Sequence, residues 1–351
     1  MASSVAATPE GQLEALLLPV TQGELALPAG ARVLFLHARV GSRLRQCAGS
    51  GWLCQQGFRP FADELQRAGL AVGEPAHGDR FDLVLVLPPR QRDEARAVFA
   101  RAAALASVGG CVLAAAPNAE GAKSAETDFR RLFGSVQGLS KHRCRVFWAS
   151  AGDRLDRDLQ AQWAALDEPR RIVDGYLSRP GLFAWDRIDP ASALLAAHLP
   201  GNLHGQLADL GAGYGYLSAQ AIARCPAITS VDLYEAQARA IEPAQANLGE
   251  AVAASGRAVA VRVLWHDVIQ GLPHRYDAIV SNPPFHQGRA DLPDLGRAFI
   301  VAAAAALRPG GRLWMVANRH LPYEATLAAH FAQVRTVATQ DGFKVIEAVR
   351  G

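Results

Sequence analysis

The stretch GQLADLGAGYG, residues 205–215, decides the fold of the C-terminal half of the chain. Its apolar beginning predicts a buried strand, and Gly211, Gly213 and Gly215 lie in the turn that follows. The next segment, 216–225, has the composition of a helix. A strand, a glycine-rich turn and a helix in this order are typical of a doubly wound α/β sheet, where ligands bind beyond the carboxyl ends of the strands.

The same alternation of strands and helices continues to the end of the chain, which predicts a mostly parallel sheet covered on both faces. The last two strands are separated only by a short link, so they must form an antiparallel hairpin at the sheet edge. After the first strand, the expected strands are 230–235, 260–267, 276–282, 312–318, 334–340 and 343–350.

The N-terminal half repeats this pattern more faintly, with expected strands at 32–38, 81–89, 109–117 and 145–150. Placing DLVLVLPPR (82–90) over DAIVSNPPF (277–285) aligns the aspartates and both pairs of prolines. In each half a helix then leads to a Gly-Gly pair before another apolar strand. The halves therefore look like two copies of one unit.

The predicted fold is α/β, with two tandem Rossmann-like domains and an antiparallel edge hairpin in the C-terminal copy. The expected boundaries are a first domain at 1–155, a linker at 156–177 and a second domain at 178–351. The first copy is degenerate, because it has Leu87 in place of Asn282 and no glycine-rich turn. We expect it to stabilise the second copy or to hold a macromolecular substrate, and to bind no cofactor.

Three acidic residues end successive strands around the glycine-rich turn: Asp209, Glu235 and Asp267. A dinucleotide-binding fingerprint would need a glycine at Tyr216, and Asp209 would repel a pyrophosphate. An acid at this position suits a cationic ligand, such as the amino group and sulfonium of S-adenosylmethionine. Gly211 and Gly213 would let the backbone approach that ligand closely.

Glu235 is placed to accept hydrogen bonds from both hydroxyls of a ribose, and Asp267 could accept one from an adenine amino group. A single acid at a strand end is often a helix cap, and this is the alternative interpretation of Asp267. Capping alone does not readily explain three such acids around one turn.

The motif SNPPFHQG, residues 281–288, follows the fourth strand. If the Asn282 side-chain oxygen and the Pro283 carbonyl each accept one N–H of a nucleobase amine, the nitrogen lone pair faces a methyl donor. Pro283 and Pro284 fix φ and supply no competing donor, and Phe285 offers a face on which a base can stack. The alternative is a turn that ends the strand and places Phe285 in the core.

Composition excludes several classes of protein. The net charge is only +3, and the five cysteines show neither a C-x-x-C pair nor a metal-binding spacing, so we expect no metal and a reducing cytoplasm. The N-terminus lacks the basic and apolar regions of a signal peptide, and the chain has no stretch long enough for a membrane span.

Together, DLGAGYG, Glu235, Asp267 and NPPF resemble the class I S-adenosylmethionine-dependent methyltransferases that act on exocyclic amines. Three longer stretches, 178–195, 316–327 and 343–350, resemble the ribosomal small-subunit methyltransferase C family. That family is a tandem duplication with a degenerate N-terminal copy. The stretches GAKSAETDF and SKHRCRVFW in the first half are similar to it as well.

The resemblance implies methyl transfer from S-adenosylmethionine to N2 of a guanine in 16S rRNA, within the small ribosomal subunit. It places Phe183 beside the methionine end of the cofactor. Separately, we expect a monomer in the cytoplasm. The alternatives are guanine-N2 methylation of 23S rRNA, a non-catalytic RNA-binding assembly factor and a nicotinamide-dependent oxidoreductase. The missing third glycine of the fingerprint disfavours the last of these.

Two groups of basic residues are candidates for contacts with RNA phosphates. One is KHRCR at 141–145, and the other is the series Arg90, Arg92, Arg96 and Arg101. Arginines spaced along an exposed helix can equally form an ordinary solvated face, which is the alternative for the series.

Overall fold

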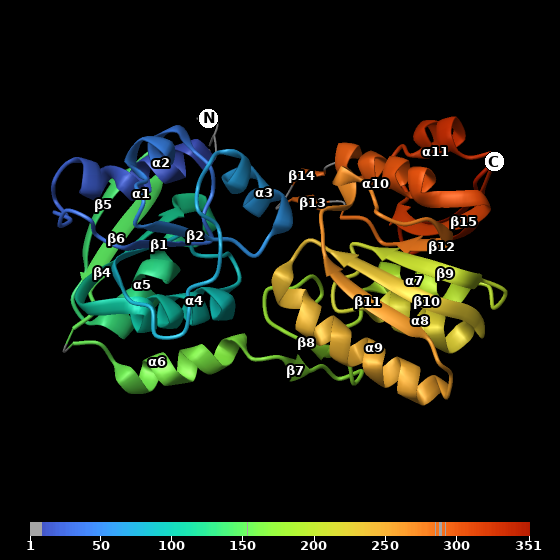
Figure 1. The fold of residues 1–351 in the computed structure, drawn as a ribbon, viewed down its shortest axis with the longest axis horizontal. Helices are drawn as coiled ribbons and strands as arrows, with labels where there is room; N and C mark the ends of the chain where they lie inside the picture. The colour runs from blue at the N-terminus through green and yellow to red at the C-terminus, as the bar shows by residue number, and fades with distance from the viewer. Residues whose placement is uncertain (1–8, 153, 285, 288–289, 292) are drawn as a thin grey trace. The chain divides into compact units, whose positions relative to one another are not determined.

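The chain folds into two compact units, Met1–Glu168 and Pro169–Gly351. The computed structural model describes residues 9–152, 154–284, 286–287, 290–291 and 293–351, with 286–287 and 290–291 described for the backbone only. Figure 1 shows both units, which are described separately below.

The residues expected to form a linker, 156–177, are divided between the two units. Helix α6 (Arg157–Ala164) packs against α4 (Arg92–Leu105) of the first unit and buries Trp163 in the first core. The short strands β7 (Arg170–Arg171) and β8 (Leu177–Ser178) pair with each other in the second unit. The indole of Trp163 gives α6 an apolar anchor that its charged sequence does not suggest.

The first unit is a six-stranded sheet in the order β2-β1-β3-β4-β6-β5, with helices on its faces. Its other elements are α1 (Pro9–Thr21), β1 (Val33–Leu36), α2 (Ser42–Cys47), β2 (Trp52–Gln55), α3 (Arg59–Arg67), β3 (Phe81–Val86), α4 (Arg92–Leu105), β4 (Ala106–Pro117), α5 (Ala122–Phe133), β5 (Gln137–Lys141) and β6 (Cys144–Ser150).

Strands β1 to β4 of the first unit are parallel, whereas β5 and β6 form an antiparallel hairpin at the edge. The sequence predicted such a hairpin only for the second copy. Strand β5 has the polar sequence QGLSK and is mostly exposed, so it carries no apolar run that would predict a strand. Its backbone pairing with β6 is what makes it a strand.

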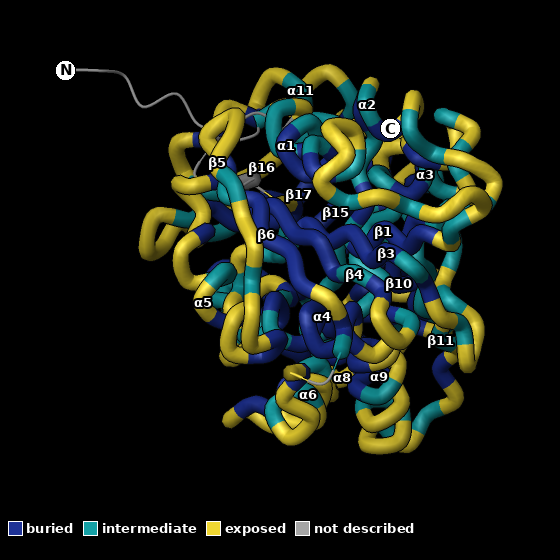
Figure 2. Tube along the Cα trace, turned by 90° about the vertical axis from the view of Figure 1, so that its left-hand side faces the viewer, coloured by how far each residue is buried: buried dark blue, intermediate teal, exposed yellow. Residues whose placement is uncertain are grey.

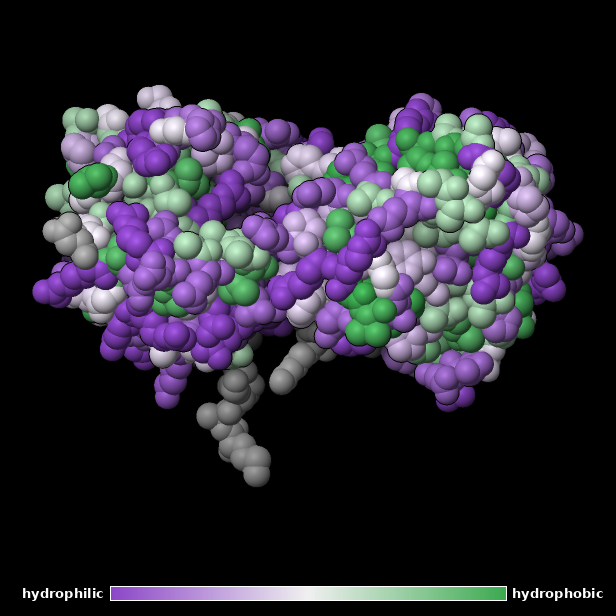
Figure 3. Space-filling model, turned by 90° about the horizontal axis from the view of Figure 1, so that it is seen from below, coloured by the Kyte–Doolittle hydropathy of each residue, from purple (hydrophilic) through white to green (hydrophobic). Residues whose placement is uncertain are grey.

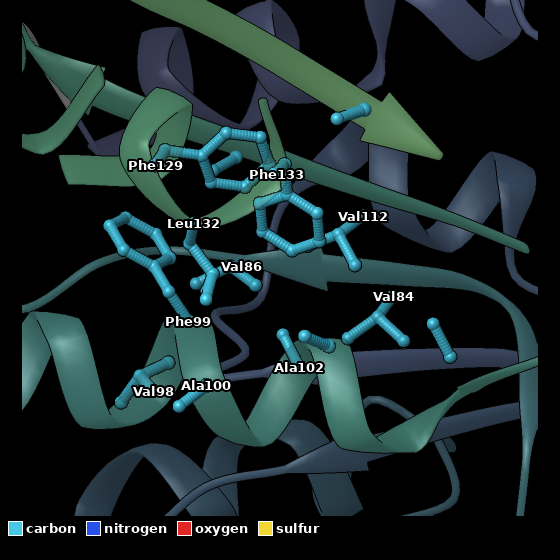
Figure 4. Close-up of a cluster of buried hydrophobic side chains, with 14 of the residues drawn as sticks. Val84, Val86, Val98, Phe99, Ala100, Ala102, Val112, Phe129, Leu132 and Phe133 are labelled. Atoms are coloured by element: carbon cyan, nitrogen blue, oxygen red, sulfur yellow. The ribbon is translucent and has the colours of Figure 1, made fainter. Parts of the chain in front are cut away.

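The first unit has an aromatic core, drawn in Figure 4. Phe129 from α5 packs against the ring of Phe99 from α4 in a T-shaped arrangement with centroids 5.3 Å apart. Phe129 also stacks on Phe133 at 4.3 Å. Such ring pairs add to the free energy gained from burial alone. The first copy is therefore a fully packed body of its own.

The second unit is built on a seven-stranded sheet in the order β11-β10-β9-β12-β15-β17-β16. Its elements after β8 are α7 (Pro190–His198), β9 (His204–Leu210), α8 (Tyr216–Arg224), β10 (Ala227–Glu235), α9 (Ile241–Ser255), β11 (Ala260–Trp265), β12 (Tyr276–Ser281), β13 (His286–Gln287), β14 (Ala290–Asp291), α10 (Pro293–Ala306), β15 (Leu307–Asn318), α11 (Glu324–His330), β16 (Gln333–Gln340) and β17 (Phe343–Val349).

Strands β9 to β12 and β15 run parallel, and β16 and β17 close the sheet as an antiparallel pair. This confirms the predicted doubly wound sheet with an edge hairpin. The chain leaves the central strand β9 for β10 on one side and later returns to β12 on the other. The carboxyl ends of β9 and β12 therefore flank the point where ligands bind in such sheets.

Equivalent hydrogen bonds confirm that the two units are copies of one design. Asp82 Oδ2 accepts a hydrogen bond from Arg32 N at 2.9 Å, and Asp277 Oδ2 accepts one from Gln206 N at 2.8 Å. In both units the aspartate begins the strand that precedes the two prolines, and it caps the start of the central strand.

The Gly-Gly pairs also occupy matching positions. Gly109 N donates to Ala151 O in the first unit, and Gly310 N donates to Arg350 O in the second. In the first unit this bond joins β4 to the residue after β6. In the second unit it joins β15 to the residue after β17. The aligned sequence positions are therefore also equivalent in space.

Burial follows the layers in both units. Figure 2 shows the central strands buried and the outer turns of the helices exposed. Hydrophilic and hydrophobic residues are interspersed on the face seen in Figure 3, as is normal for a globular domain. Across the described residues, no helix combines the length and the apolar character that a bilayer crossing requires.

Candidate active site

Asp209 lies at the end of the central strand β9 and is completely buried. Its Oδ2 accepts hydrogen bonds from Ser218 N at 3.0 Å and Ser218 Oγ at 2.7 Å. Its Oδ1 is buried and has no hydrogen-bond partner among the described residues. Because a buried acceptor without a partner is costly, this atom indicates a missing donor.

Burial raises the pKa of Asp209 to about 7, since the two hydrogen bonds from Ser218 offset only part of the desolvation of the carboxylate. The negative charge of Glu235 nearby raises this pKa further. A cation bound at Oδ1 would stabilise the ionised form and lower the pKa again. The position is therefore suited to a positively charged group.

The glycine-rich turn follows directly. Gly213 has a φ of +55°, and a β-carbon at this residue would have no atom within 4 Å, so the turn is open at this point. Gly215 has a φ of +88° and caps helix α8, where a β-carbon would lie 2.5 Å from Leu248. Gly215 is thus required by packing, whereas Gly213 leaves space beside the turn.

Glu235 ends the neighbouring strand β10 and turns its carboxylate towards the glycine-rich turn. Oε2 accepts a hydrogen bond from Gly213 N, and Oε1 accepts one from Gln237 N, both at 2.7 Å. Burial raises the pKa of Glu235, while these backbone donors lower it. The contact brings the first two acids of the sequence prediction to the same turn.

Asp267 follows β11 and caps the short 3-10 helix Val268–Gln270. Its Oδ1 accepts a hydrogen bond from Ile269 N at 3.1 Å. This is the capping role that the sequence left open as an alternative. A contact between Asp267 and an adenine amino group stays a prediction.

The Asn-Pro-Pro motif lies at the end of β12, next to β9. Ser281 Oγ donates a hydrogen bond to Leu210 O at 2.8 Å, which joins the ends of the two strands. A β-carbon on Gly211 would lie 3.8 Å from Pro284 Cδ, so the motif and the glycine-rich turn are in contact. Two motifs about seventy residues apart in sequence therefore meet at one sheet edge.

The amide nitrogen of Asn282 donates to Asp189 Oδ2 at 2.9 Å and to Ser192 Oγ at 2.8 Å. Within the described part of the chain, Asn282 Oδ1 accepts no hydrogen bond. Pro283 is buried and Pro284 is exposed. Phe285, the fourth residue of the predicted motif, lies outside the described residues.

Sequence reasoning missed Asp189 and Ser192. The available signal was an aspartate before a proline, which predicts a helix N-cap. Asp189 does cap α7, because Oδ2 also accepts a hydrogen bond from Ser192 N at 2.8 Å. Nothing in the sequence indicated that the same oxygen would also hold Asn282.

Phe183 lies in the loop before α7, and its side chain is 68% exposed. Two hydrogen bonds hold this loop: Tyr214 Oη donates to Arg187 O at 3.0 Å, and Arg239 donates to Pro180 O at 2.9 Å. The loop is thereby tied to Tyr214 of the glycine-rich turn.

The arginine series forms ion pairs within the first unit. Arg92 and Arg96 both bind Asp128, a carboxylate whose side chain is only 2% exposed. Arg90 pairs with Glu120, and Arg101 pairs with Glu74. In KHRCR, Arg145 pairs with Glu126. These ion pairs favour, for the arginine series, the alternative of an ordinary solvated face over contacts with RNA phosphates.

No group of metal-ligating side chains is present among the described residues, and the five cysteines are free thiols. Burial raises the pKa of the Cys54 thiol to about 12, which makes it unreactive. The residues available for chemistry at the sheet edge are therefore the acids and the Asn-Pro-Pro motif.

A doubly wound sheet with this turn, these acids and this motif defines a methyltransferase of the Rossmann-like class. The family model of the methyltransferase small domain matches residues 175–347, which lie within the second unit. The chain is 30% identical over 299 residues to the ribosomal RNA small subunit methyltransferase C of Pectobacterium atrosepticum, covering 85% of this chain and 82% of that one.

A relative of the same name from a Shewanella species is 29% identical over 273 residues, 77% of each chain. Among solved structures, a 16S rRNA N2 guanine methyltransferase of T. thermophilus, in complex with S-adenosylmethionine and guanosine, superposes with a TM-score of 0.77. The match has 25% identity and covers 99% of this chain and 94% of that one. The chain belongs to the ribosomal RNA small subunit methyltransferase C family, which confirms the resemblance found in the sequence.

Proposed function

We propose that this protein transfers a methyl group from S-adenosylmethionine to the exocyclic N2 amine of a guanine in 16S rRNA, within the small ribosomal subunit. One observation carries the proposal. Asn282 and the glycine-rich turn lie at the carboxyl ends of adjacent strands, and the buried Oδ1 of Asp209 beside them has no partner in the part of the chain that the structure describes. A cofactor site and an amine-binding group are thereby brought together.

The residues around the turn fit the cofactor. Asp209 Oδ1 would accept a hydrogen bond from its ammonium group, and the open space beside Gly213 would admit it. Glu235 would bind the ribose hydroxyls and Asp267 the adenine amine, while Phe183 would lie beside the methionine end. When bound, S-adenosylmethionine supplies a methyl group whose bond to sulfur breaks, with its electron pair, as the new N–C bond forms.

The chain's own residues orient the guanine amine. Asn282 Oδ1 and the Pro283 carbonyl would each accept one N–H, so that the nitrogen lone pair points at the methyl group. Pro283 and Pro284 hold the backbone in position, and Phe285 would stack on the base. The methylated amine then loses one proton to water. Catalysis of this kind rests on positioning and needs no metal and no covalent enzyme intermediate.

The first unit would hold the RNA or stabilise the second unit, since Leu87 replaces the amide of Asn282 there. We further propose that the protein acts as a monomer in the cytoplasm. These assignments rest on the family and on the contrast between the copies.

The test is transfer of tritiated methyl from S-adenosylmethionine to ribosomal subunits that lack the modification. We expect label in the small subunit and in its 16S rRNA. Label in the large subunit would support the 23S alternative, and no label in either would support a non-catalytic assembly factor. Calorimetry with S-adenosylmethionine and with NAD separates the methyltransferase from an oxidoreductase.

A further inference from the structure

The amide of Asn282 is held by a helix that lies about ninety residues earlier in the chain. Asp189 and Ser192 are at the N-terminus of α7 (Pro190–His198), whereas Asn282 follows β12. The two Nδ2–O distances, 2.9 Å to Asp189 Oδ2 and 2.8 Å to Ser192 Oγ, are those of normal hydrogen bonds.

We propose that Asp189 and Ser192 are positioning residues for methyl transfer, which direct the Oδ1 atom of Asn282 towards the substrate amine by binding its Nδ2. The inference rests on the proposed function, because it gives that function's amide a fixed orientation. Neither residue is assigned any contact with substrate or cofactor.

Both amide protons of Asn282 are engaged in hydrogen bonds. A side-chain amide has two N–H donors and one carbonyl acceptor. Asp189 and Ser192 together accept both N–H groups, so the nitrogen edge of the amide is saturated. Only the oxygen edge is left for a ligand.

The side-chain amide of Asn282 is also prevented from rotating by 180° about χ2. A rotation of 180° about χ2 would place Oδ1 of Asn282 against the carboxylate of Asp189, and two acceptors would then face each other. Repulsion between them makes this orientation unfavourable. A neutral partner alone would not discriminate as strongly, because a serine hydroxyl can donate as well as accept.

The carboxylate of Asp189 is itself held in place. Asp189 Oδ2 also accepts a hydrogen bond from Ser192 N at 2.8 Å, as the N-cap of α7. The carboxylate is therefore fixed by its own helix before it binds Asn282. Its negative charge strengthens the hydrogen bond and polarises the amide, which makes Oδ1 a better acceptor.

The first copy has no side-chain amide at the equivalent position. Leu87 stands at the position of Asn282 and is buried in an apolar cluster that also contains Leu13 of α1. Glu10, the acidic residue near the start of α1, accepts a hydrogen bond from Ser42 N at 2.9 Å. In the first copy, which has no amide at this strand end, the carboxylate of Glu10 is thus bound by the start of α2.

The test measures steady-state methyl transfer, with kcat and the KM for S-adenosylmethionine, in variants of the full chain. Asp189→Ser keeps an N-cap but is too short to reach Asn282, so kcat should fall by roughly 10²-fold with little change in the KM for S-adenosylmethionine. Asp189→Asn keeps the cap and an acceptor oxygen but removes the charge, so its kcat should lie between those of Asp189→Ser and the wild type. A wild-type kcat in Asp189→Ser would overturn the proposal.

The matched control is Asp156→Ala in the first unit. Asp156 caps α6 through a hydrogen bond from Leu159 N at 2.9 Å, as Asp189 caps α7, but lies in the other unit. We expect this variant to keep its rate within about twofold. An equal loss of rate in Asp156→Ala and Asp189→Ser would mean that weakened folding is the cause, and the proposal would fail.

A double-mutant cycle tests whether Ser192 acts through Asn282. Ser192→Ala should lower kcat by about tenfold in the wild-type background and have no further effect in Asn282→Ala. An equal effect in both backgrounds would show that Ser192 acts elsewhere, which would overturn its assigned role.

A measurement that needs no methyl transfer separates this inference from the proposed function. In protein with 15N-labelled asparagine, the signal missing from Asn282→Ala identifies its side-chain NH2. We expect slow exchange of both protons in the wild type and fast exchange in Asp189→Ser. If the wild type methylates no RNA, the proposed function fails, while slow exchange still supports the held amide and fast exchange overturns it.

Discussion

Each unit has its own sheet, with the same strand order around the centre and equivalent hydrogen bonds at the start of the strands. The two units differ at the ends of two strands. The second unit has Asp209 and Asn282 there, whereas the first has Phe35 and Leu87, both in an apolar cluster. Parallel pairing of β1 with β3 and of β9 with β12 makes these positions equivalent. The first unit therefore has the same backbone arrangement but lacks the polar side chains to which we assign cofactor and substrate binding.

This difference shows what the prolines do. Both copies have a Pro-Pro pair after the strand, so the prolines form a turn in either unit. In the second copy Asn282 lies in front of them, held by Asp189 and adjacent to the glycine-rich turn. The amide of Asn282, and not the Pro-Pro turn, distinguishes the copy to which we assign catalysis.

Removal of the amide should break the comparison most strongly. We expect Asn282→Ala to lower the rate of methyl transfer by about three orders of magnitude, because the substrate amine loses the group that orients it. The affinity for S-adenosylmethionine, measured by calorimetry, should stay within about threefold of the wild type.

The equivalent position in the first unit provides the control for this variant. Leu87→Val shortens a buried side chain at the matching strand end, so it should lower stability slightly and leave the rate unchanged. Normal turnover in Asn282→Ala, or an equal loss in Leu87→Val, would contradict the assignment of catalysis to the second copy.

The next largest effect is expected at Asp209. Asp209→Asn keeps the size of the side chain and removes the charge that would hold the cofactor's ammonium group. Loss of one charge-assisted hydrogen bond of about 1.5 to 3 kcal/mol predicts a Kd for S-adenosylmethionine roughly 10- to 100-fold higher. An unchanged Kd would show that Oδ1 of Asp209 is not part of the cofactor site.

The pH dependence sharpens this test. The pKa of Asp209 is about 7 without ligand, and binding of a cation requires the ionised form. As the pH falls below 7, affinity for S-adenosylmethionine should therefore fall by about tenfold for each pH unit, with proton release on binding. Asp209→Asn should lack this dependence in the same calorimetric titrations.

Stability without ligand should change in the opposite direction. The unfolded carboxyl loses its proton near its ordinary pKa of 3.8, and the folded one near 7. Between these values the unfolded state binds fewer protons, so the wild type loses stability as pH rises and reaches a constant level above 7. Denaturant unfolding of wild type and Asp209→Asn across this window should converge at low pH.

A smaller effect is expected when the amide is placed in the first copy. Leu87→Asn buries a polar group among apolar side chains. We expect a loss of about 1 to 3 kcal/mol in the free energy of unfolding. Calorimetry should still give one S-adenosylmethionine per chain, and a second site would show that a single residue separates the copies.

The smallest effect is expected for the arginine series. Arg90 and Arg101 are engaged with Glu120 and Glu74, so their replacement by glutamine should change RNA affinity by less than about twofold. An arginine that bound phosphate would instead reduce the slope of log Kd against log salt by roughly 0.7 to 0.9. Filter binding at several salt concentrations distinguishes the two cases.

The sequence was sufficient for the sheet, its edge hairpin and the duplication, because these depend on local apolar runs and on repeated turn residues. Two strands of the first unit were missed. Strand β2 (Trp52–Gln55) is only four residues long, and the pairing of β5 with β6 depends on backbone hydrogen bonds and not on apolar side chains. Helix α6 was assigned to a linker because Trp163 is its main buried side chain.

The candidate site was predictable where a residue ends a strand, as for Asp209, Glu235 and Asn282. It was not predictable where two distant segments meet. Asp189 has the sequence signature of a helix cap, and only the folded chain places its carboxylate 2.9 Å from the Asn282 amide. Local patterns indicate which residues can cap a helix but carry no information about tertiary partners.

The most direct measurement of the central claim is nucleoside analysis by mass spectrometry of 16S rRNA from unmodified small subunits, after incubation with the protein and S-adenosylmethionine. The account predicts one N2-methylguanosine per 16S rRNA with the wild type and none with Asn282→Ala. Methylation of another base, or N2-methylguanosine formed equally by both proteins, would contradict it.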